Sequence, residues 1–221
     1  MLTLKIGAIE YDVPAGRLSL PRTGVWSADL LAMTDGPLTG EATLTVSGVE
    51  MPAHIQRAEM VAGKLSMRLV GGAGGLGKPE TKKHYKGVTI LHVLQDLLST
   101  AGESMAPSCE TAVLNMPLQA WTSLAVPIGS LLQALAETAG LGVAWRVLYN
   151  GQVWIGNETW PMCPADVRIL DADGANASQV LGTDALGIWP GTVIAGRRVD
   201  YVVHEVGGVN RSTVHWAESH L

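Results

Sequence analysis

The chain has 221 residues, 47% of them hydrophobic, and a formal net charge of −5 at pH 7. This composition excludes a disordered chain, and scattered charges with a small negative sum argue against a general nucleic-acid-binding protein. No apolar run approaches the roughly 20 residues of a membrane helix, and the first residues lack a secretory signal pattern. Only 16% of the residues are charged, against a usual ~25%, which favours a subunit that buries surface in an assembly.

The first part of the chain carries the patterns of short strands separated by turns. Apolar and polar residues alternate loosely over residues 2–12, with a break near Gly7, and clearly over residues 42–49. Residues 18–31 are typical of one half-buried strand, whereas residues 51–62 fit either a strand or one turn of helix. Short strands with turns every ~8–12 residues predict a small antiparallel sandwich or barrel.

A glycine-rich segment, residues 71–77, follows these strands. Residues 72–78 fit the phosphate-loop pattern G-x-x-x-x-G-K, and Gly72, Gly74 and Gly77 fit G-x-G-x-x-G. Both patterns need a helix directly behind the loop, and the first also needs Ser or Thr for Mg²⁺. Position 79 is proline, without a hydroxyl or an N–H group, and the next residues have no helical apolar face. We therefore favour a flexible connector. The alternative is a nucleotide-binding enzyme that uses residues 72–78.

Two amphipathic helices are predicted after the glycines. The first begins after Thr89 and stops at Gly102, and the second begins near Pro127 and stops at Gly140. Apolar side chains recur at helical spacing in both: Ile90, Leu91, Leu94, Leu97, Leu98 and Ala101, then Leu131, Leu132, Leu135, Ala136 and Ala139. Asp96 stands about 20 residues behind the glycines, as a dinucleotide fingerprint requires, but it falls inside the first helix. His92 on the same helix is expected to be solvated.

Residues 142–149 and 152–156 flank Asn150-Gly151, which predicts a β-hairpin with a type I′ turn. Trp145 and Trp154 lie on the two strands, and we expect them to pack in the core or across the hairpin. Exposed together with Trp160, they would instead form the stacking platform of a glycan-binding module.

The prolines of residues 159–164 predict a boundary, after which the chain returns to strands. Residues 191–205 and 210–217 predict a long hairpin, across which His204 and His215 are expected to come close. Because no cysteine or carboxylate clearly joins these histidines, we predict no metal site there.

Other candidate ligands are weaker still. Asp171, Asp173 and Asn176 resemble part of a calcium loop, but the twelve-position spacing and the terminal glutamate are missing. Cys109 and Cys163 form no metal or redox motif and are expected to be buried or idle thiols in a reducing compartment. The chain has no G-x-S-x-G, H-E-x-x-H or C-x-x-C motif. We therefore predict a protein that is not an enzyme and has no catalytic residues, cofactor or metal.

A set of stretches covers most of the chain: Val25-Trp26-Ser27-Ala28, 70–76, 93–103, Trp121 with the helix to Gly140, 145–148, 153–156, and 190–204 with 212–216. Taken together they resemble the central hub proteins of phage tail baseplates, which include contractile-tail hubs and the late control protein D-like family. The resemblance implies an α+β, mostly β fold. Its core is a tail-tube-like antiparallel β-barrel, interrupted by a small α/β insertion with two helices and a β-hairpin.

On this resemblance, residues 1–77 begin the barrel, residues 78–163 are the insertion and residues 164–221 complete the barrel. The implied function is that of a structural subunit of a phage tail tip or baseplate hub. Copies would form a ring, usually a homotrimer, that joins the tail tube or distal tail protein to a spike or tip protein. The expected location is the virion tail, with the host cytoplasm during assembly. Neither a membrane nor a specific nucleic acid is an expected partner.

Overall fold

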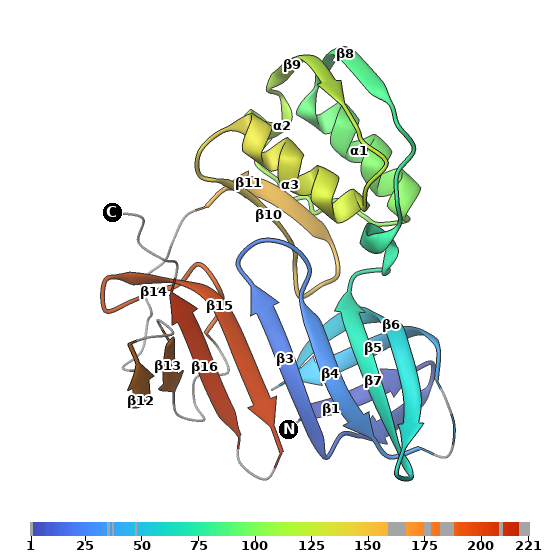
Figure 1. Cartoon of the computed structure of the whole chain (residues 1–221), viewed down its shortest axis with the longest axis vertical. Coiled ribbons are helices and arrows are strands. Elements are labelled where there is room, and N and C mark those ends of the chain that lie inside the picture. The colour runs from blue at the N-terminus through green and yellow to red at the C-terminus, as the bar shows by residue number, and fades with distance from the viewer. Residues whose placement is uncertain are drawn as a thin grey trace.

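The computed structural model describes residues 2–34, 36, 38–46, 48–158, 167–174, 178–181, 188–207 and 210–216. The fold is mostly β, as predicted. A large sheet fills one half of the molecule, and three helices with two short strand pairs fill the other (Figure 1). We call these halves the sheet region and the helical region, the latter comprising residues 75–158.

Among the described residues, twelve strands form one antiparallel sheet. Seven come from the first part of the chain: β1 (Leu2–Ile6), β2 (Ile9–Asp12), β3 (Ala15–Pro21), β4 (Ser27–Ala32), β5 (Gly40–Val46), β6 (Val49–Val61) and β7 (Lys64–Gly71). Five come from the last part: β12 (Ile169–Asp173), β13 (Ser178–Leu181), β14 (Val193–Ile194), β15 (Arg197–Val206) and β16 (Arg211–Trp216). The order is β12-β13-β16-β15-β3-β4-β7-β6-β5-β1-β2, with β14 paired to β15. Strand β3 pairs with β15, so both parts of the chain share one sheet.

Two of the predicted strands are wrong in extent. Residues 18–31 form parts of two strands, β3 and β4, which pair antiparallel with Ser19 opposite Ser27. The chain reverses between them around Gly24, whose φ of 100° few other residues adopt. Residues 191–205 likewise divide into β14 and β15. The ambiguous residues 51–62 lie almost wholly in the long strand β6.

The sheet curls so that strands far apart in its order face each other. A Cβ atom added to Gly16 of β3 would lie 2.6 Å from Leu30 of β4 and 2.8 Å from Leu2 of β1. The core between them is apolar, with Leu4, Leu44, Leu65 and Leu69 fully buried. Among the described residues, however, no strand pairing closes the sheet into a barrel, because its order ends at β12 and β2.

The helical region contains a 3₁₀ turn η1 (Gly75–Gly77), three helices and two separate strand pairs. The helices are α1 (Ile90–Ala101), α2 (Thr111–Leu114) and α3 (Ile128–Ala139), and the pairs are β8 (His84–Thr89) with β9 (Pro117–Thr122) and β10 (Val143–Val147) with β11 (Val153–Asn157). Both predicted long helices are confirmed, with Gly102 and Gly140 at their ends in positive φ. Within the described ranges, no helix is long and apolar enough to cross a bilayer.

The predicted hairpin at Asn150-Gly151 is confirmed, but its type I′ turn is wrong. That turn needs positive φ at both central residues, and of the two only Gly151 has it, at 80°. The loop is longer instead. The Gly151 N–H donates to the Leu148 carbonyl (3.0 Å), and the Leu148 N–H donates to the Gln152 carbonyl (2.9 Å).

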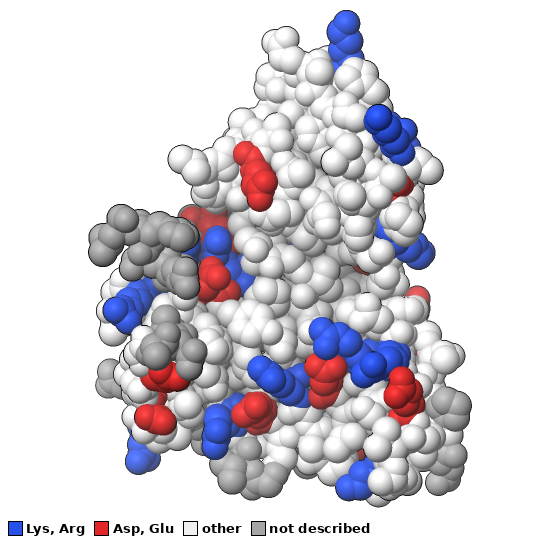
Figure 2. All heavy atoms as spheres, viewed as in Figure 1, with Lys and Arg blue, Asp and Glu red and all other residues white. Residues whose placement is uncertain are grey.

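The outer face of the sheet carries a row of charges that runs across the strands (Figure 2). Directly opposed residues of antiparallel strands share a face, and the register aligns six charged residues: Arg211, Glu205, Arg17, Asp29, Arg68 and Arg57. We call this row the charge ladder. Arg68 Nη1 lies 3.0 Å from Asp29 Oδ2 within it. The sign alternates from Arg211 to Arg68, so these strands attract their neighbours on a face that stays in water, whereas Arg68 and Arg57 carry the same charge.

Candidate functional site

The glycine-rich segment joins the two regions, and its glycines are packed tightly. The Gly71 N–H donates to the Trp26 carbonyl (2.9 Å). A Cβ added to Gly71 would lie 2.3 Å from Trp26 Nε1, and one added to Gly75 would lie 1.7 Å from the Ala101 carbonyl oxygen. The expectation of a flexible connector is therefore wrong, because the segment is packed between the two regions. Gly71, Gly72, Gly74 and Gly75 are glycine because backbone and side chains of both regions approach too closely for a Cβ.

The carboxylate of Glu103 lies where a phosphate would lie in a nucleotide-binding loop. The Ala73 N–H donates to Glu103 Oε2 (2.9 Å) and the Gly75 N–H donates to Oε1 (3.0 Å). Successive backbone N–H groups of this kind form an anion-binding concavity, and here the chain supplies the anion itself. The contact ties the end of β7 to the residue that follows the C-cap of α1.

The other requirements of a nucleotide site fail as well. Behind the loop, residues 75–89 are all described and contain only the 3₁₀ turn η1 and strand β8 before α1 begins. The exposed Lys78 uses its backbone N–H to close that turn, on the Gly75 carbonyl (3.0 Å). Asp96 lies on α1 and binds Lys83 and Tyr85. The geometric basis for the nucleotide-binding alternative is therefore lost.

A second set of contacts joins the two regions through Arg22, on the turn between β3 and β4. Arg22 Nη1 donates to Glu158 Oε2 (2.5 Å), and Arg22 Nε donates to Asp200 Oδ1 (2.6 Å) on β15. The Glu158 side chain is 2% exposed. Arg146 of β10 approaches the same carboxylate, with Nη1 3.7 Å from Glu158 Oε1. Burial lowers the pKa of Arg146, and the Glu158 charge opposes that shift.

Backbone bonds run beside these ion pairs. The Gly24 N–H donates to the Trp145 carbonyl (2.8 Å), and the Val147 N–H donates to the Gly24 carbonyl (2.9 Å). Strand β10 is thereby held against the β3–β4 turn. Arg22 lies 136 residues from Glu158 and 178 from Asp200 in the sequence. Residues 71–75 with Glu103, and Arg22 with Glu158, Asp200 and Arg146, together form what we call the junction.

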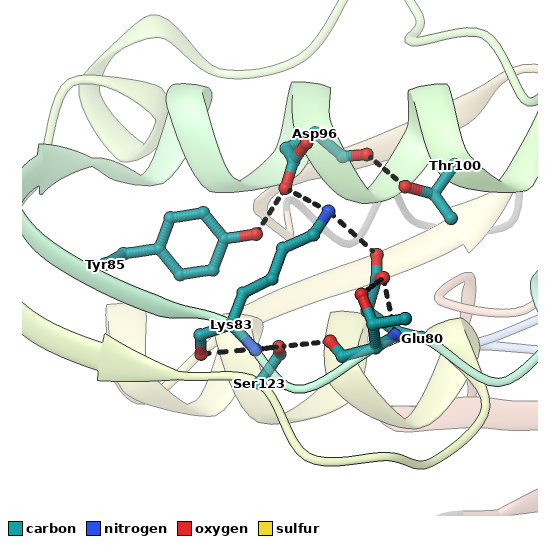
Figure 3. A network of polar contacts seen from close by, with 7 residues as sticks. Glu80, Lys83, Tyr85, Asp96, Thr100 and Ser123 are labelled. Atoms are coloured by element: carbon teal, nitrogen blue, oxygen red, sulfur yellow. Dashed lines mark hydrogen bonds and ion pairs between the residues drawn. The ribbon is translucent and has the colours of Figure 1, made fainter.

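A polar network inside the helical region holds the β8–β9 pair against α1 (Figure 3). Lys83 Nζ lies 2.8 Å from Asp96 Oδ2 and 3.5 Å from Glu80 Oε2, and the Tyr85 hydroxyl donates to the same Asp96 oxygen. Bonds from Lys83 and Tyr85 lower the pKa of Asp96, whereas burial and the Asp96 contact raise that of Tyr85. Lys83 and Tyr85 thus stabilise the ionised form of Asp96, and these contacts hold the β8–β9 pair against α1.

The tryptophans do not form the platform of the glycan-binding alternative. Trp145 pairs with Ile155 and Trp154 pairs with Arg146, so the two indoles lie on opposite faces of the β10–β11 hairpin. Trp145 is buried, and its Nε1 donates to Gln133 Oε1 (3.1 Å). The Arg146 guanidinium lies 4.9 Å from the centre of the Trp154 ring, a cation–π contact. Trp160 lies outside the described residues.

The histidines are separated by their register. His204 of β15 is opposite Ser212, whereas His215 of β16 is opposite Tyr201, so the expected approach of the two histidines is wrong. His204 is 2% exposed, its Nδ1 is 2.8 Å from Ser212 Oγ, and burial lowers its pKa to about 4. His215 instead packs its ring edge-on against Tyr201.

The remaining candidate ligands do not converge. Asp171 and Asp173 lie on β12, an exposed strand, and Asn176 and Cys163 lie outside the described residues. Cys109 is buried, with Sγ 3.6 Å from the Val153 carbonyl oxygen. Across the described ranges, no group of three or more His, Cys, Asp or Glu side chains is placed to hold a metal ion.

A cleft of about 590 Å³ opens beside the glycine-rich segment, between the strands β1, β5 and β6 and the loops of the helical region. Its lining includes Lys5, Glu41, Thr43, Pro52, Glu103 and Asn150. Sequence reasoning singled out the glycines but missed Glu103 and Arg22. No local motif marks them, since their partners are distant in sequence.

No protein-family model matches this sequence, and no curated protein matches it. Solved structures do match it over nearly its whole length. The 43 kDa tail protein of prophage MuSo2 from Shewanella oneidensis has a TM-score of 0.72 and 10% identity, with 98% of this chain and 97% of that chain covered. The chain has the fold of a phage tail protein. The predicted resemblance to baseplate hub proteins is thus confirmed at the level of the fold.

Two further structures share this tail-protein fold. The tail protein from Neisseria meningitidis MC58 has a TM-score of 0.69 and 13% identity, covering 99% of this chain and 96% of that one. The E. coli c3393 protein, a component of the type VI secretion system, has a TM-score of 0.71 and 9% identity, covering 99% and 77%. That component is itself described as structurally similar to the T4 bacteriophage tail proteins gp27 and gp5.

Proposed function

We propose that the chain is a structural subunit of a phage tail tip or baseplate hub. The observation that supports this most strongly is the tail-protein fold, which extends over 98–99% of the chain in three solved structures. The low charged fraction of 16% also suits a subunit that buries surface in an assembly.

In this proposal the curled sheet is the tail-tube-like barrel domain. Residues 1–77 begin it, residues 164–221 complete it, and residues 78–163 are an α/β insertion. Copies form a ring, a homotrimer, by heterologous contacts. The ring joins the tail tube or distal tail protein to a spike or tip protein, and the subunit assembles in the host cytoplasm before it is part of the virion.

The junction suits this role because a ring between two other parts of a particle must keep its regions in a fixed orientation. Glu103 and Glu158 join the sheet region and the helical region at separate points, one by backbone N–H groups and the other by arginine. A junction held twice resists both bending and twisting better than a single connector.

The proposal is tested by the mass in solution, measured by light scattering across a range of protein concentrations. We expect a species at three times the chain mass of 23.3 kDa, with the fraction of this species rising with concentration. A strict monomer at all concentrations, both alone and after mixing with purified tail-tube protein, would contradict the ring.

A further inference from the structure

The two parts of the chain that build the large sheet meet along one line, between β3 and β15. Six residue pairs join these strands, from Tyr201 opposite Pro21 to Val206 opposite Gly16. Among the described residues, no other strand from the last part of the chain pairs with a strand from the first part. We call this line the seam, and Figure 1 shows it where the red strands lie beside the blue β3.

The two ends of the seam are held by different contacts. At one end, the Arg22 N–H donates to the Asp200 carbonyl (2.8 Å), and Arg22 Nε donates to Asp200 Oδ1 (2.6 Å). The other end lies two pairs beyond His204, and there Arg17 and Glu205 oppose each other on the solvated outer face. Backbone and side chain both anchor the first end, whereas exposed charges contribute little to the second. The seam therefore opens most easily at the end that carries His204.

His204 lies at the seam on the buried inner face of the sheet. Its Nδ1 is 2.8 Å from Ser212 Oγ on β16, and its buried Nε2 has no hydrogen-bond partner among the described residues. Across the seam it is opposite Leu18 of β3, an apolar residue that is itself buried. The imidazole is therefore bonded to the last part of the chain, while its neighbour across the seam is apolar.

The inner face around His204 is uncharged in the part of the chain that the structure describes. There the register places residues of β1, β3, β4, β13, β15 and β16, and those close to His204 are Leu18, Leu20, Leu181, Val202, Ser212 and Val214. Half-buried Tyr11 of β2 also packs against this core. No carboxylate is thus beside the imidazole to stabilise a proton on it.

The charged residues of the neighbouring strands lie elsewhere. Asp200 binds Arg22 at the far end of the seam. Three others belong to the charge ladder on the outer face: Arg17, Glu205 and Arg211. A positive charge on His204 therefore has no negative partner close by, and burying it without one is costly. Such a charge is stabilised when the imidazole reaches water, which requires the inner face to open.

We propose that a proton on His204 opens the sheet at the seam, where β15 and β16 swing away from β3 as one unit. These two strands stay together because six register pairs join them and His204 is bonded to Ser212. The contact between Arg22 and Asp200 remains as the hinge. The inference rests on the fold alone and goes beyond the proposed ring, since it gives the subunit an opening that responds to acid.

The direction of the acid response follows from burial. Burial lowers the pKa of His204 to about 4 in the closed sheet, against about 6.5 for an exposed histidine. The closed seam therefore keeps its full stability above pH 6.5 and loses stability as the pH falls toward 4. From these two pKa values, the equilibrium constant for opening rises about 70-fold between pH 7.5 and pH 4.5.

Hydrogen exchange followed by mass spectrometry tests the proposal on the wild-type chain at pH 7.5 and 4.5, with rates corrected for the intrinsic effect of pH. We expect the protection of residues 16–21 and 199–206 to fall about 70-fold, while residues 90–101 of α1 stay protected. Protection at the seam that is equal at the two pH values overturns the proposal. An equal loss of protection in α1 also overturns it, because the whole fold then opens and not the seam.

A substitution at His204 tests which group carries the proton. Glutamine does not titrate, so we expect the seam protection of His204→Gln to change by less than about threefold between the same pH values. His215→Gln, on the outer face of the same hairpin, is the matched control and should retain the wild-type change. If His204→Gln responds to acid as the wild type does, another group carries the proton and the proposal fails.

A disulfide across the seam tests the opening without a change at His204. Arg17→Cys and Glu205→Cys place two thiols at directly opposed positions, whose Cα separation of about 5 Å suits a disulfide. The background is Cys163→Ser, in which the remaining Cys109 is buried. We expect the oxidised chain to lose the acid response and the reduced chain to recover it. An acid response that survives the closed disulfide overturns the proposal.

Discussion

The junction and the outer face of the sheet use the same kinds of charged side chain in opposite ways. At the junction, Glu158 is 2% exposed and meets Arg22, while Glu103 accepts two backbone N–H bonds. On the outer face, Asp29 and Arg68 are nearly half exposed and belong to the charge ladder. A buried carboxylate without its partner is costly, whereas a surface pair contributes little. The same residue types therefore fix the orientation of the two regions in one place and keep a sheet face solvated in the other.

The largest loss of stability is expected from a substitution at Gly75 of the junction. We expect Gly75→Ala to lower the free energy of unfolding by about 4 kcal/mol or more, because its Cβ would lie 1.7 Å from the Ala101 carbonyl oxygen. Urea unfolding followed by tryptophan fluorescence measures the change. The control is Gly77→Ala, since a Cβ at Gly77 meets nothing within 4 Å. Equal stability of the two variants would show that the junction is not packed as described.

The next effect concerns His204, on the buried face beneath the charge ladder. Burial lowers its folded-state pKa to about 4, against about 6.5 in the unfolded chain. The neutral form is therefore favoured by folding. The contribution of neutral His204 to the free energy of unfolding is fully present above pH 6.5. It is lost as the pH falls toward 4, by about 3 kcal/mol in total.

Unfolding of the wild type and of His204→Gln across pH 4 to 7.5 tests this expectation. The difference in stability between the two should shrink or reverse toward low pH, because glutamine does not titrate. His215→Gln, on the more exposed face of the same hairpin, is the matched control. A parallel pH dependence for wild type and His204→Gln would contradict the buried neutral histidine.

The anion-binding loop gives a smaller effect. Glu103→Ala leaves the N–H groups of Ala73 and Gly75 without their carboxylate, so we expect a loss of about 2 kcal/mol. Glu50→Ala, in the wall of the same cleft, should cost no more than about 0.5 kcal/mol. Thermal unfolding compares the two. Should Glu103→Ala be as stable as Glu50→Ala, the loop would not depend on its internal anion.

The smallest effect is expected on the charge ladder. Asp29→Asn should lower stability by about 0.5 kcal/mol, since the pair with Arg68 is exposed. A double-mutant cycle with Arg68→Gln isolates the coupling between the two, which should fade in 1 M salt. A coupling of 2 kcal/mol or more, or one insensitive to salt, would show that the exposed pair of the ladder stabilises the fold as strongly as the buried pairs of the junction.

The sequence by itself determined where the two long helices lie and where several strands lie. Apolar residues at helical spacing and the stops at Gly102 and Gly140 predicted α1 and α3, because these signals are local. Alternation over residues 42–49 predicted β5 for the same reason. Alternation wrongly predicted a single strand over residues 18–31, because the alternating pattern continues on both sides of the reversal at Gly24.

Only the tertiary structure decided what the glycine-rich segment does. In the sequence, the five glycines between residues 71 and 77 matched both a flexible connector and a phosphate-loop pattern, and Pro79 favoured the connector. The deciding partners come from elsewhere in the chain: Trp26 for Gly71, Ala101 for Gly75 and Glu103 for the loop N–H groups. Likewise, Arg22 finds Asp200 across 178 residues. Local patterns record the periodicity of the backbone, whereas close approach and charge pairing depend on which segments the fold brings together.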